Sequence, residues 1–289
     1  MRWEAGHKSG NVIDRRGAPS YGGGRGVRVG VPMGLGGLLV LGVLSLLFGR
    51  DLLSPALGGG DAAGSTPQAA PIAPSSDPDA ELVQFVSFVL DDAQAAWRAD
   101  FQRRGQPWRD ARLVLFTQAT STGCGDADAG IGPFYCPNDE QLYIDLSFYR
   151  ELRSRFGAPG DFAQAYVLAH EVGHHVQHQL GIDARVRDEE QRDPSRASAL
   201  SVRLELQADC YAGVWARSTA RRQLLEPGDM DEAMRAATAV GDDTLERSAG
   251  QIVRPDSFTH GSAAQRTYWL HQGYQSGSLD ACDTFRDGS

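Results

Sequence analysis

The chain has 289 residues, of which 41% are hydrophobic and 22% are charged, values typical of a globular protein rather than a disordered or fibrous one. Its formal net charge is −9, although seven of its 28 basic residues and only two of its 37 acidic residues lie in the first 50 positions. The acidic remainder would repel phosphate backbones, so the composition argues against nucleic-acid binding.

Residues 27–48, VRVGVPMGLGGLLVLGVLSLLF, form an apolar stretch that is long enough to cross a bilayer. A helix of roughly 20 apolar residues spans the hydrocarbon core. We therefore predict one transmembrane helix here, rather than a cleaved signal peptide or a buried core helix. The basic residues at or before its start predict a cytoplasmic N-terminus and an extracytoplasmic domain, periplasmic or extracellular. These basic residues are Arg2, Lys8, Arg15, Arg16, Arg25 and Arg28.

The segments on either side of this stretch have compositions that cannot build a core. Residues 1–26 are rich in Gly and Arg, and we predict a disordered basic cytoplasmic tail. Residues 49–77 are rich in Pro, Ala, Gly and Ser, and we predict a flexible linker. The folded domain is therefore expected over residues 78–289.

The domain should begin with a helix and a small sheet. Asp77 can cap a helix that Pro78 opens, and apolar residues then recur at helical spacing as far as about residue 105. Residues 111–120 and 141–148 show the short β-rich patterns of strands. A glycine-rich loop that contains two cysteines joins the two strands.

Four cysteines follow the apolar stretch, and an even number in an oxidising compartment indicates disulfides. Three pairings are possible. We favour Cys124 with Cys136, which closes the glycine-rich loop, and Cys210 with Cys282, which ties the C-terminal tail to the interior. Four free thiols or a cysteine-ligated metal are the alternatives, but no Cys-x-x-Cys spacing supports a metal.

Residues 161–180 predict a helix that carries the motif HEVGH. Asp161 can cap it, Gly181 can end it, and an apolar stripe runs along one face. His170 and His174 are four residues apart and so project from one face, where both can bind one zinc ion. Glu171 then lies beside the zinc and can act as a general base. His175 and His178 are expected to be structural or surface residues.

A second long helix, from about Pro194 to Thr219, carries the motif ELQAD. Glu205 and Asp209 are four residues apart and share a face. Glu205 can complete a set of two histidines and one glutamate, and Asp209 can accept the other N–H of a ligand histidine. A solvated acidic face is the alternative, but small and apolar residues surround the pair. We predict one Zn²⁺ per chain on His170, His174 and Glu205.

Two further helices are expected near 231–240 and 262–273, the second opened by a capping box of Ser262 and Gln265. The predicted fold class is α+β, a mostly helical domain with a small β-sheet, preceded by the transmembrane helix.

Four stretches, HEVGHHVQ, RLELQADCYAGVWA, GPFYCPNDEQLYIDLSF and SFTHGSAAQR, together resemble the neutral zinc metallopeptidase family of bacterial membrane-anchored proteins. The resemblance covers nearly the whole chain. The order of the expected ligands, two histidines on one helix and a glutamate on a later helix, is also similar to that of thermolysin-type zincins, and this implies a zincin-like fold. It implies that the substrate is a peptide or protein, whereas the spacing of the residues indicates only metal-assisted hydrolysis.

The resulting hypothesis is a membrane-anchored zinc endopeptidase with Glu171 as the general base. His260 can donate to the oxyanion, although a capping or packing role is equally consistent with its position before a helix. The strand that contains Tyr143, Ile144 and Asp145 can pair with an extended substrate. The alternative function is an extracytoplasmic scaffold or adaptor in which zinc is structural and no turnover occurs.

Overall fold

A four-stranded sheet and a set of packed helices make up the part of the chain that the computed structural model describes, residues 1–17 and 77–286. The sheet has the order β1-β2-β6-β5. Its first three strands are parallel, and β5 is antiparallel to β6. The strands are β1 (Val12–Asp14), β2 (Arg112–Phe116), β5 (Phe134–Cys136) and β6 (Gln141–Asp145). A separate antiparallel hairpin consists of β3 (Ala119–Thr122) and β4 (Gly125–Asp128).

The helices account for most of the described residues, which confirms the predicted mostly helical α+β class. Their bounds are α3 (Ala80–Arg103), α4 (Ser147–Ser154), α5 (Asp161–Gln179), α6 (Ile182–Arg192), α7 (Ala197–Arg221), α8 (Asp229–Ala239), α9 (Asp242–Ser248) and α10 (Ala263–Ser276). Helices α4, α6 and α9 were not expected from the sequence. The predicted second strand is shorter than expected, because the chain leaves the sheet after Asp145 and α4 begins at Ser147.

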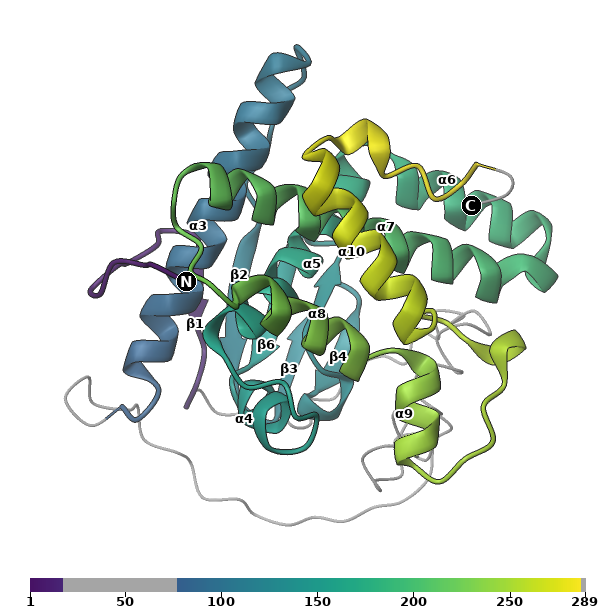
Figure 1. Cartoon of the computed structure of the whole chain (residues 1–289), viewed down its shortest axis with the longest axis horizontal. Coiled ribbons are helices and arrows are strands. Elements are labelled where there is room, and N and C mark those ends of the chain that lie inside the picture. Colours follow the sequence, from purple (N-terminus) through teal and green to yellow (C-terminus); the bar gives the residue numbers. More distant parts are fainter. Residues whose placement is uncertain (18–76, 287–289) are drawn as a thin grey trace, which may run out of the picture.

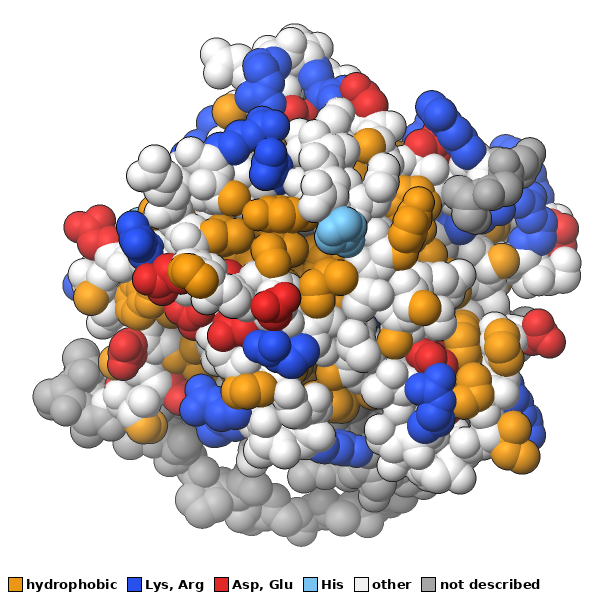
Figure 2. Space-filling model, in the orientation of Figure 1, with side chains coloured by type: hydrophobic (Ala, Val, Ile, Leu, Met, Phe, Trp, Pro, Cys, Tyr) orange, Lys and Arg blue, Asp and Glu red, His pale blue; other side chains and the backbone are white. Residues whose placement is uncertain are grey.

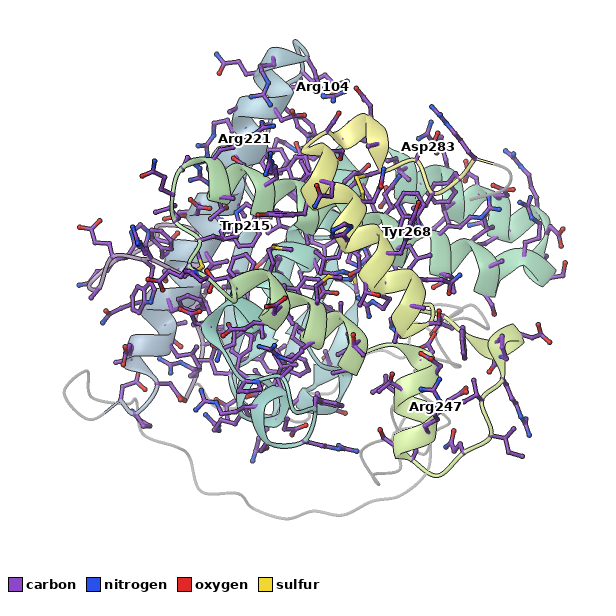
Figure 3. All side chains as sticks on the ribbon, in the orientation of Figure 1. Arg104, Trp215, Arg221, Arg247, Tyr268 and Asp283 are labelled. Atoms are coloured by element: carbon purple, nitrogen blue, oxygen red, sulfur yellow. A yellow bond between two sulfur atoms is a disulfide. The ribbon has the colours of Figure 1, made fainter. Side chains whose placement is uncertain are left out.

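Helix α5 lies at the centre and packs against α3, α7 and α8 (Figure 1). The core around it contains large aromatic side chains, such as the stacked rings of Phe162 on α5 and Trp215 on α7, 5.5 Å apart. Figure 3 shows Trp215 inside the helical layer. Strands β2 and β6 are buried on both faces, as expected for parallel strands covered from both sides. The central helix is therefore held rigidly, which suits an element that carries a site.

Residues 1–17 are part of the folded domain, so the prediction of a disordered tail is wrong for them. Strand β1 adds to the edge of β2, with Val12 opposite Leu113. Trp3 packs edge-to-face on Phe85 of α3, and the His7 ring bonds to Asp91 of the same helix at 2.9 Å. Sequence reasoning missed this because the segment is rich in Gly and Arg and its strand is only three residues long. The predicted domain boundary at residue 78 therefore omits a strand of the domain.

The two described segments, 1–17 and 77–286, also contact each other near residues 16 and 77. Arg16 forms an ion pair with Asp77 at 2.7 Å, and Asp77 accepts the N–H of Asp79 just before α3. The predicted cap Asp77 therefore lies before the helix, which begins at Ala80. Because β1 and β2 are hydrogen-bonded neighbours, residues 1–17 and 77–286 belong to one folded unit. The described residues therefore do not support the predicted arrangement in which a single-pass helix places the N-terminus in the cytoplasm and the domain outside.

The predicted transmembrane stretch, 27–48, and nearly all of the predicted linker, 49–77, lie outside the described residues. Within residues 1–17 and 77–286, none of the helices combines the length and the apolar composition that a membrane crossing requires. On the face of the molecule that Figure 2 shows, basic and acidic side chains are interspersed around apolar ones.

Both predicted disulfides are present. Cys124 is bonded to Cys136, which ties the β3–β4 hairpin to β5. Cys210 on α7 is bonded to Cys282, which ties the C-terminal tail to the same helix that carries Glu205 and Asp209. Closing these loops restricts the unfolded chain, which favours the folded state. Two disulfides favour an extracytoplasmic, oxidising location for the domain.

Candidate metal centre

Helices α5 and α7 cross closely enough to bring their motifs together. The contact lies at Gly173, one residue before His174, where a Cβ atom would come within 3.0 Å of the backbone oxygen of Ala208. Any larger residue at position 173 would push the helices apart. The small residues that the sequence places around Glu205 and Asp209 therefore permit the close packing that was expected from them.

The three predicted metal ligands form one cluster. His170, His174 and Glu205 each offer a ligand atom, and all of these atoms lie within 4.8 Å of one another. The Glu205 carboxylate is 3.1 Å from His170 Nε2 and 3.5 Å from His174 Nε2. Ligand atoms around a tetrahedral zinc ion lie roughly 3.3 Å apart, since each is about 2.0 to 2.1 Å from the metal. The donor set and its spacing therefore fit Zn²⁺.

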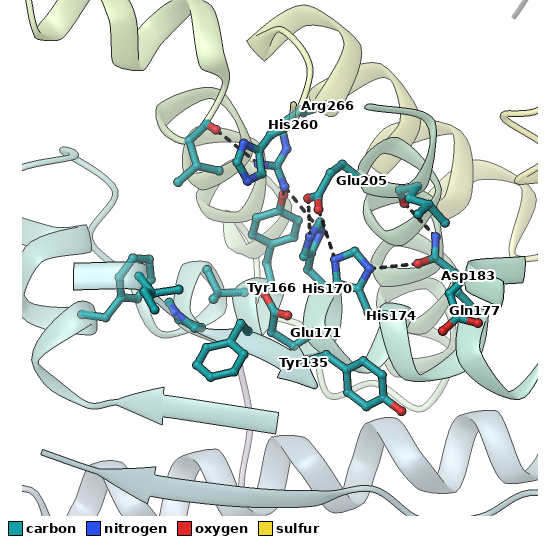
Figure 4. A pocket seen from close by; sticks show the side chains of 18 of the residues that line it. Tyr135, Tyr166, His170, Glu171, His174, Gln177, Asp183, Glu205, His260 and Arg266 are labelled. Atoms are coloured by element: carbon teal, nitrogen blue, oxygen red, sulfur yellow. Dashed lines mark hydrogen bonds and ion pairs between the residues drawn. The ribbon is translucent and has the colours of Figure 1, made fainter. Parts of the chain in front are cut away.

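The other ring nitrogen of His170, Nδ1, is hydrogen-bonded to Asp209. It is 2.8 Å from this carboxylate, which is fully buried, as predicted for the residue that orients a ligand histidine. Asp209 also accepts hydrogen bonds from the Tyr166 hydroxyl and the Arg266 guanidinium. Figure 4 shows Tyr166 and Arg266 close to His170. Sequence reasoning did not assign either residue, although Arg266 ends the stretch SFTHGSAAQR that carries part of the family resemblance.

The charges of this cluster are set by burial and by neighbouring groups. Burial opposes ionisation of Asp209, but Arg266 and His170 outweigh it and lower the pKa of that carboxyl to about 2. Burial also disfavours the charged form of His170, yet the carboxylates of Asp209 and Glu205 raise the pKa of this histidine to about 10. A metal ion must therefore displace a proton from His170 Nε2, so binding releases protons.

Glu171, the predicted base, lies against the same cavity as the ligands. Its side chain is buried, and burial raises the pKa of this carboxyl to about 8. The cavity has a volume of about 380 Å³. Its wall beside the ligands is largely apolar and is contributed by the segment before β5, β5 itself, α4, the loop after α4, and α5: Ile131, Pro133, Phe134, Phe148, Phe156 and Val167.

His260 lines this cavity too, so the structure brings the tentative oxyanion donor to the cluster (Figure 4). Its Nδ1 is 3.1 Å from Asp242 Oδ1. The other oxygen of Asp242 accepts backbone N–H groups from Thr259, His260 and Gly261 at 2.7 to 3.0 Å. Burial lowers the pKa of His260, but the hydrogen bond to Asp242 and the negative charges of Glu205 and Asp242 together outweigh it, and the net shift is upward. Asp242, which the sequence did not single out, thus fixes both the loop and the ring.

The predicted substrate strand is wrong. Tyr143, Ile144 and Asp145 belong to β6, which lies between β2 and β5 and pairs with β5 as far as Tyr143, and none of the three lines the cavity. Tyr143 is also buried and donates its hydroxyl to Asp139, and Asp145 accepts backbone N–H groups from Gln118 and Ser147. The free edge next to the cavity is β5. The alternation of residues in β6 indicated a strand, but strand order depends on pairing and cannot be read from one strand.

His175 and His178 lie away from the cluster, as expected. His175 is completely buried, between the Tyr135 hydroxyl and the backbone oxygen of Arg109. His178 bonds to Asp183 at 2.9 Å. A second group of acidic residues, Asp161, Asp229 and Glu232, is the other candidate for a metal among the described residues. It contains no histidine, and its Asp161 and Asp229 bond to the backbone nitrogen of Met1.

Relatives of the chain are found in distant bacteria. The protein YpfJ of Escherichia coli (strain K12) is 44% identical over 291 residues, which cover 99% of both chains. The protein Rv2575 of Mycobacterium tuberculosis (strain H37Rv) is 46% identical over 184 residues, 60% of this chain and 61% of its own. Both carry the description "uncharacterized protein". No solved structure matches the chain.

The family described as "Putative neutral zinc metallopeptidase" matches residues 1–285. The match includes residues 1–17, which agrees with their place in the folded domain. It also includes both helices of the cluster. The chain belongs to this zinc metallopeptidase family.

Proposed function

We propose that the protein is a zinc-dependent endopeptidase that acts on peptides or proteins outside the cytoplasm. The observation that carries the proposal is the position of Glu171 in a cavity beside three converging zinc ligands, His170, His174 and Glu205. A zinc ion held there supplies Lewis acidity to the scissile carbonyl and to the attacking water. Three protein ligands leave one position of a tetrahedral zinc ion free, which is the pattern of catalytic sites.

Glu171 performs the proton transfers in this mechanism. It takes a proton from the water that attacks the carbonyl carbon, and it passes that proton to the amide nitrogen as the carbon–nitrogen bond breaks. The products are a carboxylate and an amine. A carboxyl group whose pKa is raised by burial is suited to hold a proton between these two steps.

His260 and β5 are the features that we expect to contact the substrate. His260 lines the cavity, and because Asp242 anchors its Nδ1, Nε2 is the ring nitrogen that can donate to the oxygen that becomes negative. Strand β5 offers the free edge of the sheet, and Phe134 and Tyr135 on this strand line the cavity. An extended peptide can therefore pair with β5 while its scissile bond lies near Glu171.

The alternative is a scaffold in which zinc is only structural. A structural site closes its coordination with four protein ligands and does not require a buried carboxylate next to the first histidine. The described residues offer three ligands and an adjoining cavity instead. The geometry therefore favours the peptidase.

The test is hydrolysis of an unfolded casein-like substrate by the full-length, zinc-loaded protein. We expect cleavage that stops when zinc is removed by a chelator and returns when zinc is restored. The Glu171→Gln protein, loaded with the same amount of zinc, is the matched control and should not cleave. Equal cleavage by the parent and by Glu171→Gln would contradict the mechanism, and a zinc-loaded parent with no cleavage of any unfolded substrate would favour the scaffold.

A further inference from the structure

Arg266 is a buried cation that the proposed reaction does not use. Its side chain is about 5% exposed, and it comes from α10, which contributes none of the zinc ligands. Burying a guanidinium is costly unless all its donors find partners. Because this charge is buried next to the predicted metal ligand His170, its role requires an explanation.

Two glycines place α10 against α7. A Cβ atom at Gly273 would overlap the backbone oxygen of Cys210, and a Cβ atom at Gly213 would overlap that of Leu270. The two helix backbones therefore touch at this crossing. Arg266 lies two turns before Gly273, and Asp209 lies one turn before Gly213, so the crossing brings these two side chains together.

The guanidinium of Arg266 donates hydrogen bonds to both oxygens of Asp209. Nε is 2.8 Å from Oδ2, and Nη2 is 3.0 Å from Oδ1. Nη1 donates to the Val240 carbonyl at 3.2 Å, and Nη2 also lies 3.3 Å from the Tyr166 oxygen and 3.4 Å from His170 Nδ1. Such a two-point contact is strong and fixes the plane of the carboxylate.

The donors around Asp209 determine where the proton of His170 lies. Arginine donates only and cannot accept, so both oxygens of Asp209 face donors and act as acceptors. The Nδ1 atom of His170, 2.8 Å from Oδ1, must then carry the hydrogen of that contact. A neutral His170 consequently presents the lone pair of Nε2 toward Glu205 and His174, where a zinc ion would lie.

We propose that Arg266 is a positioning residue for the metal ligand His170, which acts by holding Asp209 as a two-oxygen acceptor and so fixes the tautomer and the orientation of the ring. The inference rests on the proposed zinc site but not on peptidase activity. Arg266 is neither a ligand nor a group that takes part in proton transfer.

The test is the zinc dissociation constant of the full-length protein, measured by competition with a chromogenic chelator. Arg266→Gln should raise this constant about 10- to 100-fold, the range typical of groups that support a ligand. The matched control is Arg222→Gln, which removes another arginine from a buried aspartate, Asp92, between α7 and α3. The control should lower the melting temperature and leave the zinc dissociation constant unchanged.

A double-mutant cycle separates this role from general stabilisation. In the Asp209→Asn background, Arg266→Gln should change the zinc dissociation constant by less than about 3-fold, because Arg266 acts through Asp209. Arg266→Lys keeps the charge but loses the two-point contact, and it should weaken zinc binding several-fold. This variant serves as the test if Arg266→Gln does not fold.

Parent-like zinc affinity in the folded Arg266 variants would overturn the inference, and so would a full additional loss in the Asp209→Asn background. A parent protein that binds no zinc would instead refute the proposed metal site itself. The two failures are therefore distinguishable.

Discussion

Two pairs of histidines on α5 have different surroundings although they lie within nine residues of one another. His170 and His174 face α7, where Glu205 lies between their rings and the cavity opens beside them. His175 and His178 face β5 and the loop before β2, and Tyr135 lies close to both rings. Helical geometry separates His175 from the ligand pair, because adjacent residues project about 100° apart. His178 lies one further turn along the helix from His174, which takes it away from Glu205.

The two pairs also differ in whether their ring nitrogens are available to bind a ligand. The first pair has a carboxylate from another helix and access to a cavity, so its nitrogen atoms can bind a ligand. His175 has both ring nitrogens within hydrogen-bond distance of protein atoms and no exposed surface. Histidine in a helix therefore indicates a metal only where a second element supplies the remaining donors.

The largest expected effect comes from removing the carboxylate that the two ligand histidines share. Glu205→Ala should abolish stoichiometric zinc binding and all peptidase activity, because two histidines alone hold zinc weakly. Metal content after dialysis measures this. Asp188→Ala, which removes an exposed carboxylate from α6, is the control and should bind one zinc per chain. Full zinc content in Glu205→Ala would show that the ligand set is wrong.

Glu171→Gln should lower kcat by about 10² to 10⁴-fold while zinc binding persists. Glutamine has the same size as glutamate but cannot accept the proton of the attacking water. Parallel measurements of kcat and zinc content test the separation of base from ligand. Loss of zinc in this variant would instead place Glu171 among the ligands.

His260→Ala should lower kcat by about 10² to 10³-fold, the cost of losing one donor to a developing oxyanion, with little change in zinc affinity. The control is His271→Ala, which removes an exposed histidine of α10. A rise in KM alone, with kcat unchanged, would assign His260 to substrate binding rather than to stabilisation of the transition state.

The smallest effect on activity is expected at His175. His175→Gln should destabilise the fold by about 1 to 3 kcal/mol, because it leaves buried partners without their hydrogen bonds, and should leave kcat of the folded protein near that of the parent. Comparison of thermal unfolding with the activity at a lower temperature tests this. A selective loss of activity would show that the second pair of histidines is not merely structural.

The pH dependence of stability provides a sharper test at the same residue. Burial lowers the pKa of His175 to about 4, so the unfolded chain binds this proton more readily than the folded protein. The contribution of His175 to stability is complete above about pH 6.5 and is lost as the pH falls toward about 4. The difference between the parent and His175→Gln, both measured with excess chelator, should therefore shrink over this range. A difference that is constant with pH would contradict the shift.

Most of the candidate site could be predicted because its parts follow local rules. Spacings of four residues placed His170 with His174 and Glu205 with Asp209, and the small residues of α7 indicated a close helix contact. The capping box of Ser262 and Gln265 also formed as expected. Asp242 and Arg266 could not be assigned in this way, because their partners His260 and Asp209 lie 18 and 57 residues away.

The sequence by itself determined the helices that carry the motifs and the residues of the candidate metal cluster, and it favoured the observed pairing of the four cysteines, since periodicity, loop closure and ligand chemistry act over short stretches. The tertiary structure decided which strand has a free edge and where residues 1–17 belong. Strand order depends on hydrogen bonds between distant segments, and three residues of β1 carry too little pattern to predict a partner. For this reason, the sequence could not show that β5 rather than β6 adjoins the cavity, or that residues 1–17 and 77–286 form one folded unit.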